Sequence, residues 1–402
     1  PKDDIMGEMD KFREMLHWDK CAACGECLLN CRYMHFSKDE AITEIRKINQ
    51  GLHSQSRAAR DCVSCYACDA FCPNGAHPYE RIHYVWNERY ERLGLPARAS
   101  YLMPGRFPNF RQSLRYTTRE KALHKKWALD EPPAKTCLYP GCNLLAMPLL
   151  AEGAIFNELP VWGRWNLCCG EMFFRMGALA PVKRTARHLT EFYRNKEIEE
   201  LVFICPAGYN MFSNVLPQQF GARFDFKKTY FTDWFMKKLD EGTFRITKKL
   251  SGSVVIHDSC HGRVLGEEFM ENQRRLLVRL GLNVVEMNEK RAHGLCCGVA
   301  AGCREYSLFD LARCGIKGLS AIDRTKADEA GVYCTGCLLT LGIFRLTNPF
   351  GKRLKHIVEY AREAIGERVE RTHTGKAVRM VLGIGLNALP RYVDPRHFKI
   401  EE

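Results

Sequence analysis

Short apolar runs alternate with longer amphipathic stretches along most of the chain after residue 135. The runs Leu201 to Ile204 and Val254 to Ile256 have the length and composition of buried β-strands. The stretches Val182 to Asn195 and Asn272 to Leu280 have the spacing of apolar and polar residues that is typical of helices. Strands that alternate with helices predict open parallel α/β layers in this part of the chain.

The N-terminal part has a different pattern. Ile42, Ile45 and Ile48 recur at three-residue spacing among charged residues, so we expect a helix over residues 38–50. A second helix, rich in aromatic residues, is expected over 79–93 and should pack on the elements before it. Residues 95–135 contain five prolines and many basic residues, which predicts a connector that wraps around the protein more than it packs, with one short helix over 119–128.

Length and composition narrow the class of protein. A chain of 402 residues exceeds what one hydrophobic core usually organises, so two or three domains are expected. No apolar stretch is long enough to span a membrane: residues 378–389 form the best candidate, and Arg379 interrupts it. Residues 1–10 are acidic where a secretory signal would be basic, so we do not expect export. The stretch 378–389 is expected to dock on this protein or on a partner subunit.

The 20 cysteines are far more than a chain of this size needs for disulfides. Two runs of four share the spacing Cys-x2-Cys-x2-Cys-x3-Cys: Cys21, Cys24, Cys27, Cys31 and Cys62, Cys65, Cys68, Cys72. In this spacing three thiolates bind one [4Fe–4S] cubane and the fourth binds the other cubane. We therefore assign one cubane to Cys21, Cys24, Cys27 and Cys72, and the other to Cys62, Cys65, Cys68 and Cys31. A zinc site has no use for a duplicated run of four.

Charge fits this interpretation. The formal net charge of +13 counts every thiol as neutral, whereas each cubane with four thiolates subtracts about two charges. The basic excess is therefore read as compensation for metal sites rather than as a surface for nucleic acid, and no nucleic-acid partner is expected.

The part after residue 135 contains a repeated cysteine pattern. Two Cys-Cys-Gly motifs, at 168–170 and 296–298, lie 128 residues apart, and Cys205 and Cys334 lie 129 residues apart. Each repeat also begins with a strand-like run that leads to a cysteine, Cys142 in the first and Cys260 in the second. An internal duplication explains these offsets.

These motifs, placed after a two-cluster ferredoxin-like segment, resemble the cysteine-rich CCG domain family. Its members include the D-type catalytic subunit of heterodisulfide reductase and the iron–sulfur subunits of anaerobic glycerol-3-phosphate dehydrogenase and glycolate oxidase. The resemblance implies an α/β fold with an N-terminal α-helical ferredoxin-like domain and two duplicated CCG α/β domains. The implied boundaries are 1–94 for the two-cluster domain, 95–135 for the linker, 136–250 and 251–350 for the CCG domains, and 351–402 for a basic and apolar extension.

The resemblance also implies the metal sites of the repeats. In the heterodisulfide reductases a five-cysteine set holds a noncubane [4Fe–4S] cluster at which a disulfide is cleaved. The matching residues of the second repeat are Cys260, Cys296, Cys297, Cys334 and Cys337. In the first repeat Cys142, Cys168, Cys169 and Cys205 match, but Gly208 stands at the fifth position. That site is either degenerate or holds a further cluster, with Cys137 as an alternative fifth ligand.

Other candidates for chemistry are weaker. His257, His261 and His293 lie within three residues of the expected ligands, where a histidine either transfers a proton to a leaving thiolate or orients a loop. His261 is the one we include with the catalytic cysteines. Cys303 and Cys314 are eleven residues apart, so they could share a helix face, and we expect them to be buried structural thiols.

Two functions follow from the resemblance. In the first, electrons pass through the two cubanes to the noncubane site, which reduces or oxidises a disulfide of a small molecule or protein. In the second, the chain conducts electrons between a flavoprotein dehydrogenase and a membrane haem b or quinone subunit, without a substrate of its own. Reduced thiols and oxygen-sensitive clusters predict a cytoplasmic protein, peripheral on a membrane complex if it joins one.

Overall fold

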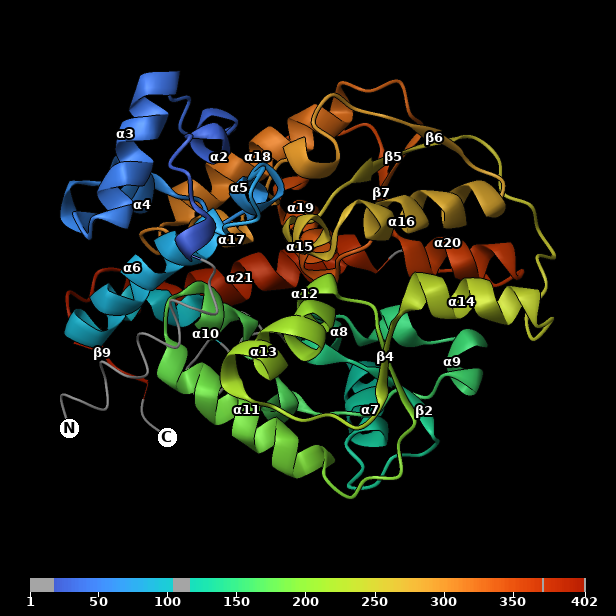
Figure 1. The fold of residues 1–402 in the computed structure, drawn as a ribbon. Coiled ribbons are helices and arrows are strands. Elements are labelled where there is room, and N and C mark those ends of the chain that lie inside the picture. The colour runs from blue at the N-terminus through green and yellow to red at the C-terminus, as the bar shows by residue number, and fades with distance from the viewer. Residues whose placement is uncertain (1–17, 104–115, 371, 401–402) are drawn as a thin grey trace.

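The computed structural model describes residues 18–103, 116–370 and 372–400. A helical N-terminal part lies beside two parallel β-sheets, which follow one another along the chain (Figure 1). The chain between and around the sheets forms mostly helices, so the predicted mixture of helices and parallel sheets is confirmed.

The N-terminal part is helical, as expected. The helix α3 begins with a capping box, in which Ser37 accepts from the backbone of Glu40 and the Glu40 carboxylate accepts from the backbone of Ser37. The two helices predicted over 38–50 and 79–93 are confirmed as α3 and α6. The elements of this part are η1 (Trp18–Lys20), α2 (Glu26–Leu29), α3 (Lys38–Asn49), η2 (His53–Gln55), α4 (Arg57–Asp61), α5 (Ala67–Ala70) and α6 (Pro78–Leu93).

The connector packs more closely than its composition suggested. Leu95, Tyr101 and Met103 are almost fully buried, and β1 (Leu95–Pro96) pairs antiparallel with β9 (His397–Phe398) near the C-terminus. The expectation of a segment that wraps more than it packs is therefore wrong for residues 95–103, because β9 pairs with residues 95–96 and the helix over residues 373–392 packs against residues 97–101. Two helices follow, η3 (Ala97–Tyr101) and the predicted short helix, α7 (Thr118–Trp127).

The two sheets have related topologies. The first has the order β2-β3-β4 and the second has the order β6-β5-β7-β8, and every pair of neighbours is parallel. In the first sheet, Val161 forms an isolated parallel bridge with Leu138 of β2. This bridge corresponds to the pairing of β6 with β5 in the second sheet. The strands are β2 (Thr136–Tyr139), β3 (Glu200–Phe203), β4 (Lys227–Tyr230), β5 (Ser253–His257), β6 (Asn283–Val285), β7 (Glu329–Val332) and β8 (Arg353–His356). The strand β8 extends the second sheet beyond the boundary expected at residue 350.

Helices connect the strands and cover the sheets. The predicted helices over 182–195 and 272–280 are confirmed within α11 and α16. The first half contains α8 (Gly141–Ala146), η4 (Pro148–Ala151), α9 (Ile155–Glu158), η5 (Trp165–Leu167), α10 (Glu171–Arg175), α11 (Leu179–Tyr193), α12 (Pro206–Asn210), the π-helical turn η6 (Met211–Val215), α13 (Leu216–Phe220) and α14 (Phe231–Asp240). The second half contains α15 (Cys260–Leu265), α16 (Glu267–Arg279), η7 (Arg291–His293), α17 (Val299–Gly302), α18 (Leu308–Asp323), α19 (Thr335–Phe344), α20 (Ile357–Ala364) and α21 (His373–Tyr392).

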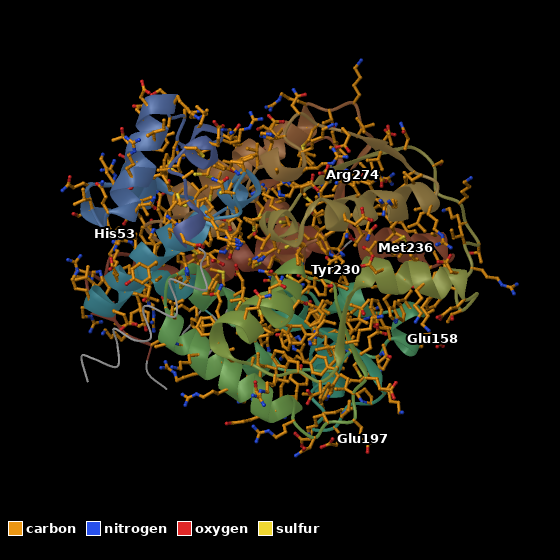
Figure 2. The ribbon with its side chains drawn as sticks, in the orientation of Figure 1. His53, Glu158, Glu197, Tyr230, Met236 and Arg274 are labelled. Carbon is orange, nitrogen blue, oxygen red and sulfur yellow. The ribbon has the colours of Figure 1, made fainter. Side chains whose placement is uncertain are left out.

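The two halves share a buried seam. Tyr230, labelled near the middle of Figure 2, is fully buried at the end of β4, and its hydroxyl contacts the backbone carbonyl of Tyr333 beyond β7. The same hydroxyl lies 3.2 Å from the carbonyl oxygen of Ile204 beyond β3. One side chain therefore joins the carboxyl ends of strands from both sheets.

The C-terminal stretch forms α21, which packs on α19 and η3 with Ala377 and Met380 buried. The expectation that residues 378–389 dock on this protein is confirmed for that face. Val378, Leu382 and Leu386 remain exposed on another face of the same helix. Among the described residues, no helix combines the length and the hydropathy that a membrane span requires.

Candidate metal centres

The second N-terminal cysteine run surrounds a cavity. Cys62, Cys65, Cys68 and Cys31 line a space of about 460 Å³ together with Cys27, and Tyr79 and Ile82 of α6 lie over it. Cys31 comes from the first run, so the structure places the fourth cysteine of one run beside the first three of the other. This proximity is what the predicted exchange of ligands requires.

The first run makes the reciprocal exchange. The thiol of Cys27 lies within electrostatic range of Cys21 and Cys24 of its own run and of Cys72, the fourth cysteine of the second run. Burial, followed by these three neighbours, raises the pKa of Cys27 to about 12. Clustered thiols that discourage one another's ionisation favour a bound cationic group, which would neutralise their thiolates.

The backbone in these runs is shaped to donate to sulfur. Ser64 and Tyr66 have positive φ angles of 54° and 61°, which side chains other than glycine adopt at a cost. The amide of Ser64 donates to Cys62 Sγ at 3.3 Å, and the amide of Ala76 donates to Cys72 Sγ at 3.3 Å. Such N–H groups stabilise thiolates and the clusters that they bind.

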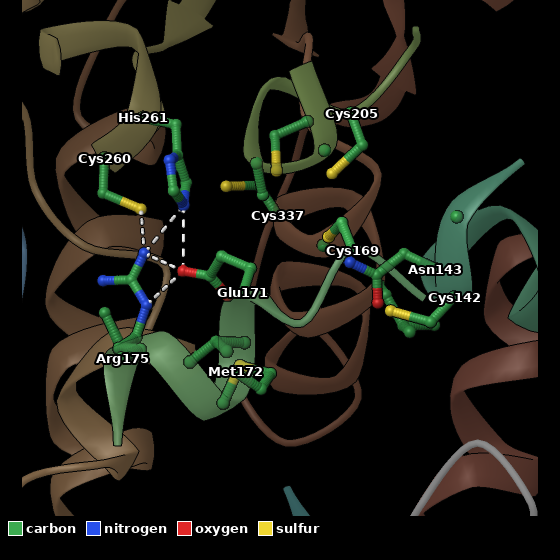
Figure 3. Close-up of a pocket in the computed structure, with 18 of the residues that line it drawn as sticks. Cys142, Asn143, Cys169, Glu171, Met172, Arg175, Cys205, Cys260, His261 and Cys337 are labelled. Carbon is green, nitrogen blue, oxygen red and sulfur yellow. Dashed lines mark hydrogen bonds and ion pairs between the residues drawn. The ribbon is translucent and has the colours of Figure 1, made fainter. Parts of the chain in front are cut away.

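The cysteines of both repeats line a single larger cavity of about 830 Å³, a volume that includes its open side. Cysteines follow strands at the carboxyl ends of the parallel sheets, which is where ligands bind in open α/β folds. Figure 3 shows residues of the first half facing Cys260 and Cys337 of the second. The cysteines that line the cavity are Cys142, Cys168, Cys169, Cys205, Cys260, Cys297, Cys334 and Cys337.

The sulfur atoms of the second repeat form a continuous group. Cys297 interacts with Cys296 and Cys337, and Cys337 interacts in turn with Cys334. Cys260 lies within electrostatic range of Cys297 and Cys334. The structure therefore brings all five predicted cysteines together, although Cys296 lies behind the cavity wall, where its amide donates to Tyr33 Oη at 2.6 Å.

The first repeat contributes to the same group. Cys168 interacts with Cys142 and Cys169, and Cys205 interacts with Cys334 of the second repeat. Gly208 lines the cavity at the position where a fifth cysteine was sought. Cys137 does not line it, because its thiol points to the carbonyl oxygen of Ala134 at 3.0 Å from within β2.

The donor set suits a cluster. Burial raises the pKa of Cys260 to about 12; Arg175 opposes this rise, and Cys297 adds to it. Among the described residues, no three His, Cys, Asp or Glu side chains are arranged around a single metal ion. The gathered thiols of Cys260, Cys297, Cys334 and Cys337 are the ligand type that iron–sulfur clusters bind, so the residues present fit such a group.

A buried ion pair forms one wall of the cavity. Arg175 Nε donates to Glu171 Oε1 at 2.6 Å, and Arg175 Nη2 lies 3.5 Å from Cys260 Sγ (Figure 3). Burial alone would lower the pKa of Arg175, but Glu171 outweighs this effect and raises it; burial would raise the pKa of Glu171, but Arg175 and His261 lower it to about 2. The pair is therefore charged, and its guanidinium donates to a predicted ligand.

His261 completes this wall. Its Nε2 lies 2.9 Å from Arg175 Nη2 and 2.9 Å from Glu171 Oε1. A guanidinium only donates, so Nε2 accepts from Arg175 in one tautomer and donates to Glu171 in the other. The structure thus places His261 against the buried ion pair, whereas His293 packs against Phe71 with ring centroids 4.7 Å apart. His257 is buried on β5, and burial lowers its pKa.

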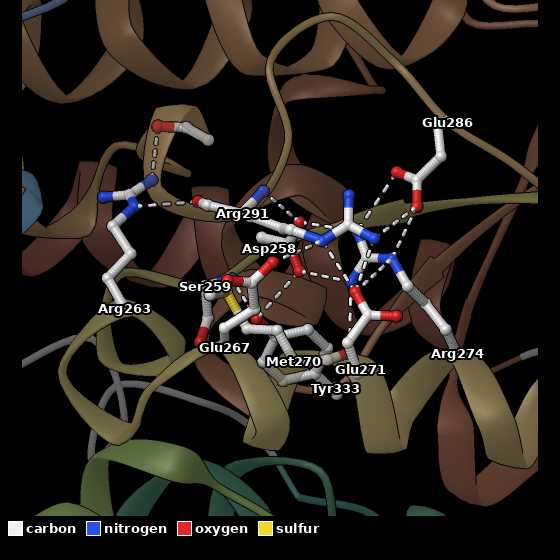
Figure 4. A network of polar contacts seen from close by, with 11 residues as sticks. Asp258, Ser259, Arg263, Glu267, Met270, Glu271, Arg274, Glu286, Arg291 and Tyr333 are labelled. Carbon is white, nitrogen blue, oxygen red and sulfur yellow. Dashed lines mark hydrogen bonds and ion pairs between the residues drawn. The ribbon is translucent and has the colours of Figure 1, made fainter. Parts of the chain in front are cut away.

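A polar network supports the loop that presents Cys260. Asp258 is fully buried and receives two hydrogen bonds from Arg274, at 2.8 and 3.1 Å (Figure 4). Tyr333 Oη accepts from the amide of Ser259 at 2.9 Å and donates to Asp258 Oδ1 at 3.2 Å. Because Tyr333 precedes Cys334, this network fixes two ligand-bearing loops relative to each other.

The sequence analysis missed Glu171 and Arg175, which lie in the first repeat but form a wall beside Cys260 of the second repeat. Glu171 follows the first Cys-Cys-Gly directly, and that position was the one available signal of its role. Cys303 and Cys314 are buried, but Cys303 follows α17 and Cys314 lies in α18, so the idea that they share one helix face is wrong.

Comparison with known families agrees with this arrangement. Residues 254–342 match the CCG cysteine-rich domain, and residues 12–77 match the 4Fe-4S dicluster domain. These two matches agree with the resemblance to CCG iron–sulfur proteins that the cysteine motifs indicated.

Several curated proteins are similar to the chain. An "EtfAB:quinone oxidoreductase" of Syntrophomonas wolfei is 22% identical over 369 residues, which are 72% of this chain and 49% of that protein. The chain thus spans about half the length of this relative. The D-type component of a dihydromethanophenazine:CoB–CoM heterodisulfide reductase of Methanosarcina barkeri is 21% identical over 404 residues, with 88% and 95% covered. The "Probable iron-sulfur-binding oxidoreductase FadF" of Bacillus subtilis is 31% identical over 118 residues, with 29% and 16% covered.

Among solved structures, a hypothetical protein from Helicobacter pylori aligns with a TM-score of 0.49 at 11% identity. The alignment covers 83% of this chain and 66% of that one.

Proposed function

We propose that this chain, an iron–sulfur oxidoreductase subunit that joins a 4Fe-4S dicluster domain to a CCG cysteine-rich domain, passes electrons through two cubane clusters to a noncubane [4Fe–4S] site that reduces or oxidises a disulfide. The observation that supports this most strongly is the convergence beside one cavity of Cys260, Cys296, Cys297, Cys334 and Cys337. The wall of the same cavity contacts the second N-terminal run, where Arg175 donates to Ser64 Oγ at 3.2 Å.

The exchanged sets would hold the two cubanes. One would be held by Cys21, Cys24, Cys27 and Cys72, and the other by Cys62, Cys65, Cys68 and Cys31. The second set is the inner one, because Tyr33 and Ser64, which adjoin its ligands, contact Cys296 and Arg175 of the CCG site. The outer set would hold the cubane that exchanges electrons with a partner redox subunit, and the inner set would hold the one that lies between it and the C-terminal site.

The five-cysteine site would hold the noncubane cluster, which supplies one electron at a time and an open iron position for sulfur. Reduction of a disulfide consumes two electrons and two protons and releases two thiols. Arg175 donates to Cys260 and fixes that ligand, and Glu171 keeps the guanidinium in place. His261 Nε2 holds or passes a proton between the wall and the cavity.

The first half is proposed to be a second, degenerate CCG domain. The shared parallel order of β2-β3-β4 and β5-β7-β8 supports this duplication. Its four cysteines complete the lining of the shared cavity rather than form a separate noncubane site, because Gly208 supplies no fifth ligand. The domain boundaries are those expected from the sequence, with the second CCG domain extended to include β8.

A conduit function is the second candidate. The similarity to an EtfAB:quinone oxidoreductase favours it, since that protein's name describes transfer to a quinone. In that case electrons leave the C-terminal cluster for a flavoprotein, haem or quinone subunit and no disulfide binds. Either function suits a cytoplasmic protein that lies on the periphery of a membrane complex.

The substitution Cys337→Ser separates the two functions. Cys337 lies in the second half of the chain, far in sequence from the predicted cubane ligands, so both cubanes should remain in the variant. Reduction of a disulfide by artificial one-electron donors should be lost. A paramagnetic signal that appears in the parent protein on addition of a thiol should disappear in the variant. A matched control is Cys137→Ser, which removes a cysteine outside the cavity and should preserve both.

The conduit function would be supported instead by two results together. The parent protein would show no thiol-dependent signal with any thiol or disulfide, and it would still pass electrons rapidly to a quinone-reactive partner.

A further inference from the structure

Arg263 lies at the junction between the dicluster domain and the CCG site. It is 4% exposed and follows Cys260 by three residues on α15. Its Nη1 donates to the carbonyl oxygen of Cys65 at 2.5 Å, and its Nη2 donates to the carbonyl oxygen of Gly294. Figure 4 shows its side chain beside Arg291, whose carbonyl oxygen lies 3.5 Å from Arg263 Nε. A single guanidinium therefore joins the inner N-terminal run to the loop before Cys296.

The charge of Arg263 has no carboxylate partner in the described part of the chain. Arg175 pairs with Glu171, and Arg274 pairs with Asp258, whereas the hydrogen bonds of Arg263 to the described residues all go to backbone carbonyl groups. A buried charge without an opposite charge is strongly destabilising, so such an arrangement ordinarily needs compensation from another anionic group.

The groups around Arg263 that can become negative are predicted ligands. Cys65, Cys260, Tyr33 and Cys296 lie within electrostatic range of the Arg263 guanidinium, which also hydrogen-bonds the carbonyl oxygen of Cys65. Cys65 belongs to the inner cubane, and Cys260 and Cys296 belong to the C-terminal set. Two bound anionic clusters, one on each side, would compensate this buried cation.

We propose that Arg263 is a positioning residue whose fixed charge raises the reduction potentials of the two metal sites that it separates. This inference rests on the proposed function for the identity of those sites. A cation and hydrogen bonds beside a cluster stabilise its more negative, reduced form. Among the described residues, no contact joins Arg263 to the ligands of the outer cubane, which are Cys21, Cys24, Cys27 and Cys72. The charge of Arg263 therefore raises the potentials of the two inner sites relative to that of the outer cubane, beside which Arg81 lies instead.

The test is a potentiometric titration of the anaerobically purified full chain, with each cluster followed by its paramagnetic resonance signal. In Arg263→Met the ratio of reduced to oxidised inner cubane at a fixed ambient potential should fall about tenfold or more, which corresponds to about 59 mV per tenfold for one electron. The C-terminal cluster should shift in the same direction. The outer cubane should shift less than about twofold.

Two further variants separate charge from structure. Arg263→Lys keeps the charge but loses the forked pair of guanidinium N–H donors. Its ratio of reduced to oxidised inner cubane at a fixed ambient potential should therefore stay within about threefold of the parent. Arg362→Met removes a buried arginine of α20 that pairs with Glu367 at 2.7 Å, and it should lower stability without moving any potential. If Arg263→Met does not retain its iron, Arg263→Gln carries the same expectation.

The inference is overturned if a loaded Arg263→Met or Arg263→Gln leaves the inner potentials unchanged, if all three clusters shift equally, or if Arg263→Lys shifts as far as the neutral variants. Failure of the proposed function looks different. A parent protein with about eight irons would lack the C-terminal cluster, yet the shift of the inner cubane would still be measurable.

Discussion

Removal of one hydroxyl group tests the network that presents the C-terminal ligands. Tyr333 is fully buried, and its hydroxyl accepts from the Ser259 amide at 2.9 Å and donates to Asp258 at 3.2 Å. In Tyr333→Phe the Ser259 amide stays buried without an acceptor, which costs about 1–3 kcal/mol, and Asp258 loses one of its hydrogen bonds. Arg274 still pairs with Asp258, so the total loss should be about 2–4 kcal/mol.

Hydrogen exchange measures this loss where it occurs. A decrease of about 2–4 kcal/mol in the free energy of opening should accelerate amide exchange in a peptide that spans Ser259 by about 30- to 1,000-fold, since about 1.4 kcal/mol is tenfold. The matched control is Tyr193→Phe, because the Tyr193 hydroxyl is buried and has no hydrogen-bond partner among the described residues. That variant should change stability by less than about 0.5 kcal/mol.

The reasoning is refuted if exchange of the Ser259 peptide changes by less than about threefold in Tyr333→Phe. It is also refuted if Tyr193→Phe destabilises the protein as much. In the first case the hydroxyl does not fix the loop, and in the second the loss would reflect packing of a buried tyrosine in general.

Three other substitutions test separate parts of the account. Gly298→Ala should abolish the C-terminal cluster signal, because Gly298 has φ 107° and an added Cβ would clash with the carbonyl oxygen of Leu311. Gly170→Ala is its control, because the nearest atoms to an added Cβ there belong to the Thr185 side chain, at 3.1 Å. That variant should keep the signal and lower the free energy of unfolding, measured by denaturation, by about 1–2 kcal/mol. Burial, with a contribution from Asp69, raises the pKa of Glu80 from 4.5 to about 8, so between these pH values the folded state binds a proton that the unfolded state releases. The parent protein should therefore lose stability as the pH rises from 4.5 to about 8. Denaturation curves at several pH values should show that Glu80→Gln removes this loss. Cys137→Ala should leave the iron content of the purified protein unchanged, whereas a decrease would make Cys137 a ligand.

The cysteine exchange in the N-terminal part was predictable because it depends on local spacing. Three residues separated by two positions wrap one site, and the fourth can reach only the neighbouring one, whatever surrounds them. The parallel strands were also predictable from local sequence, since short, uninterrupted apolar runs such as 201–204 and 254–256 are typical of strands buried inside a sheet.

The walls of the site were not predictable in this way. Arg175 and Cys260 are 85 residues apart, and Arg263 and Cys65 are 198 apart, so neither contact leaves a pattern in the sequence. The prediction for the connector was wrong for a similar reason, because the strand that pairs with it, β9, lies at the far end of the chain. Contacts between distant segments depend on how the two halves meet, which composition and periodicity do not encode.

Iron content tests the central claim most directly. The full chain, purified and analysed without oxygen, should contain about twelve iron atoms, four in each cubane and four in the C-terminal site. Its cysteines from 260 to 337 should resist alkylation until the iron is removed. About eight irons, with those cysteines freely alkylated in the native protein, would contradict the claim that the five-cysteine set holds a third cluster.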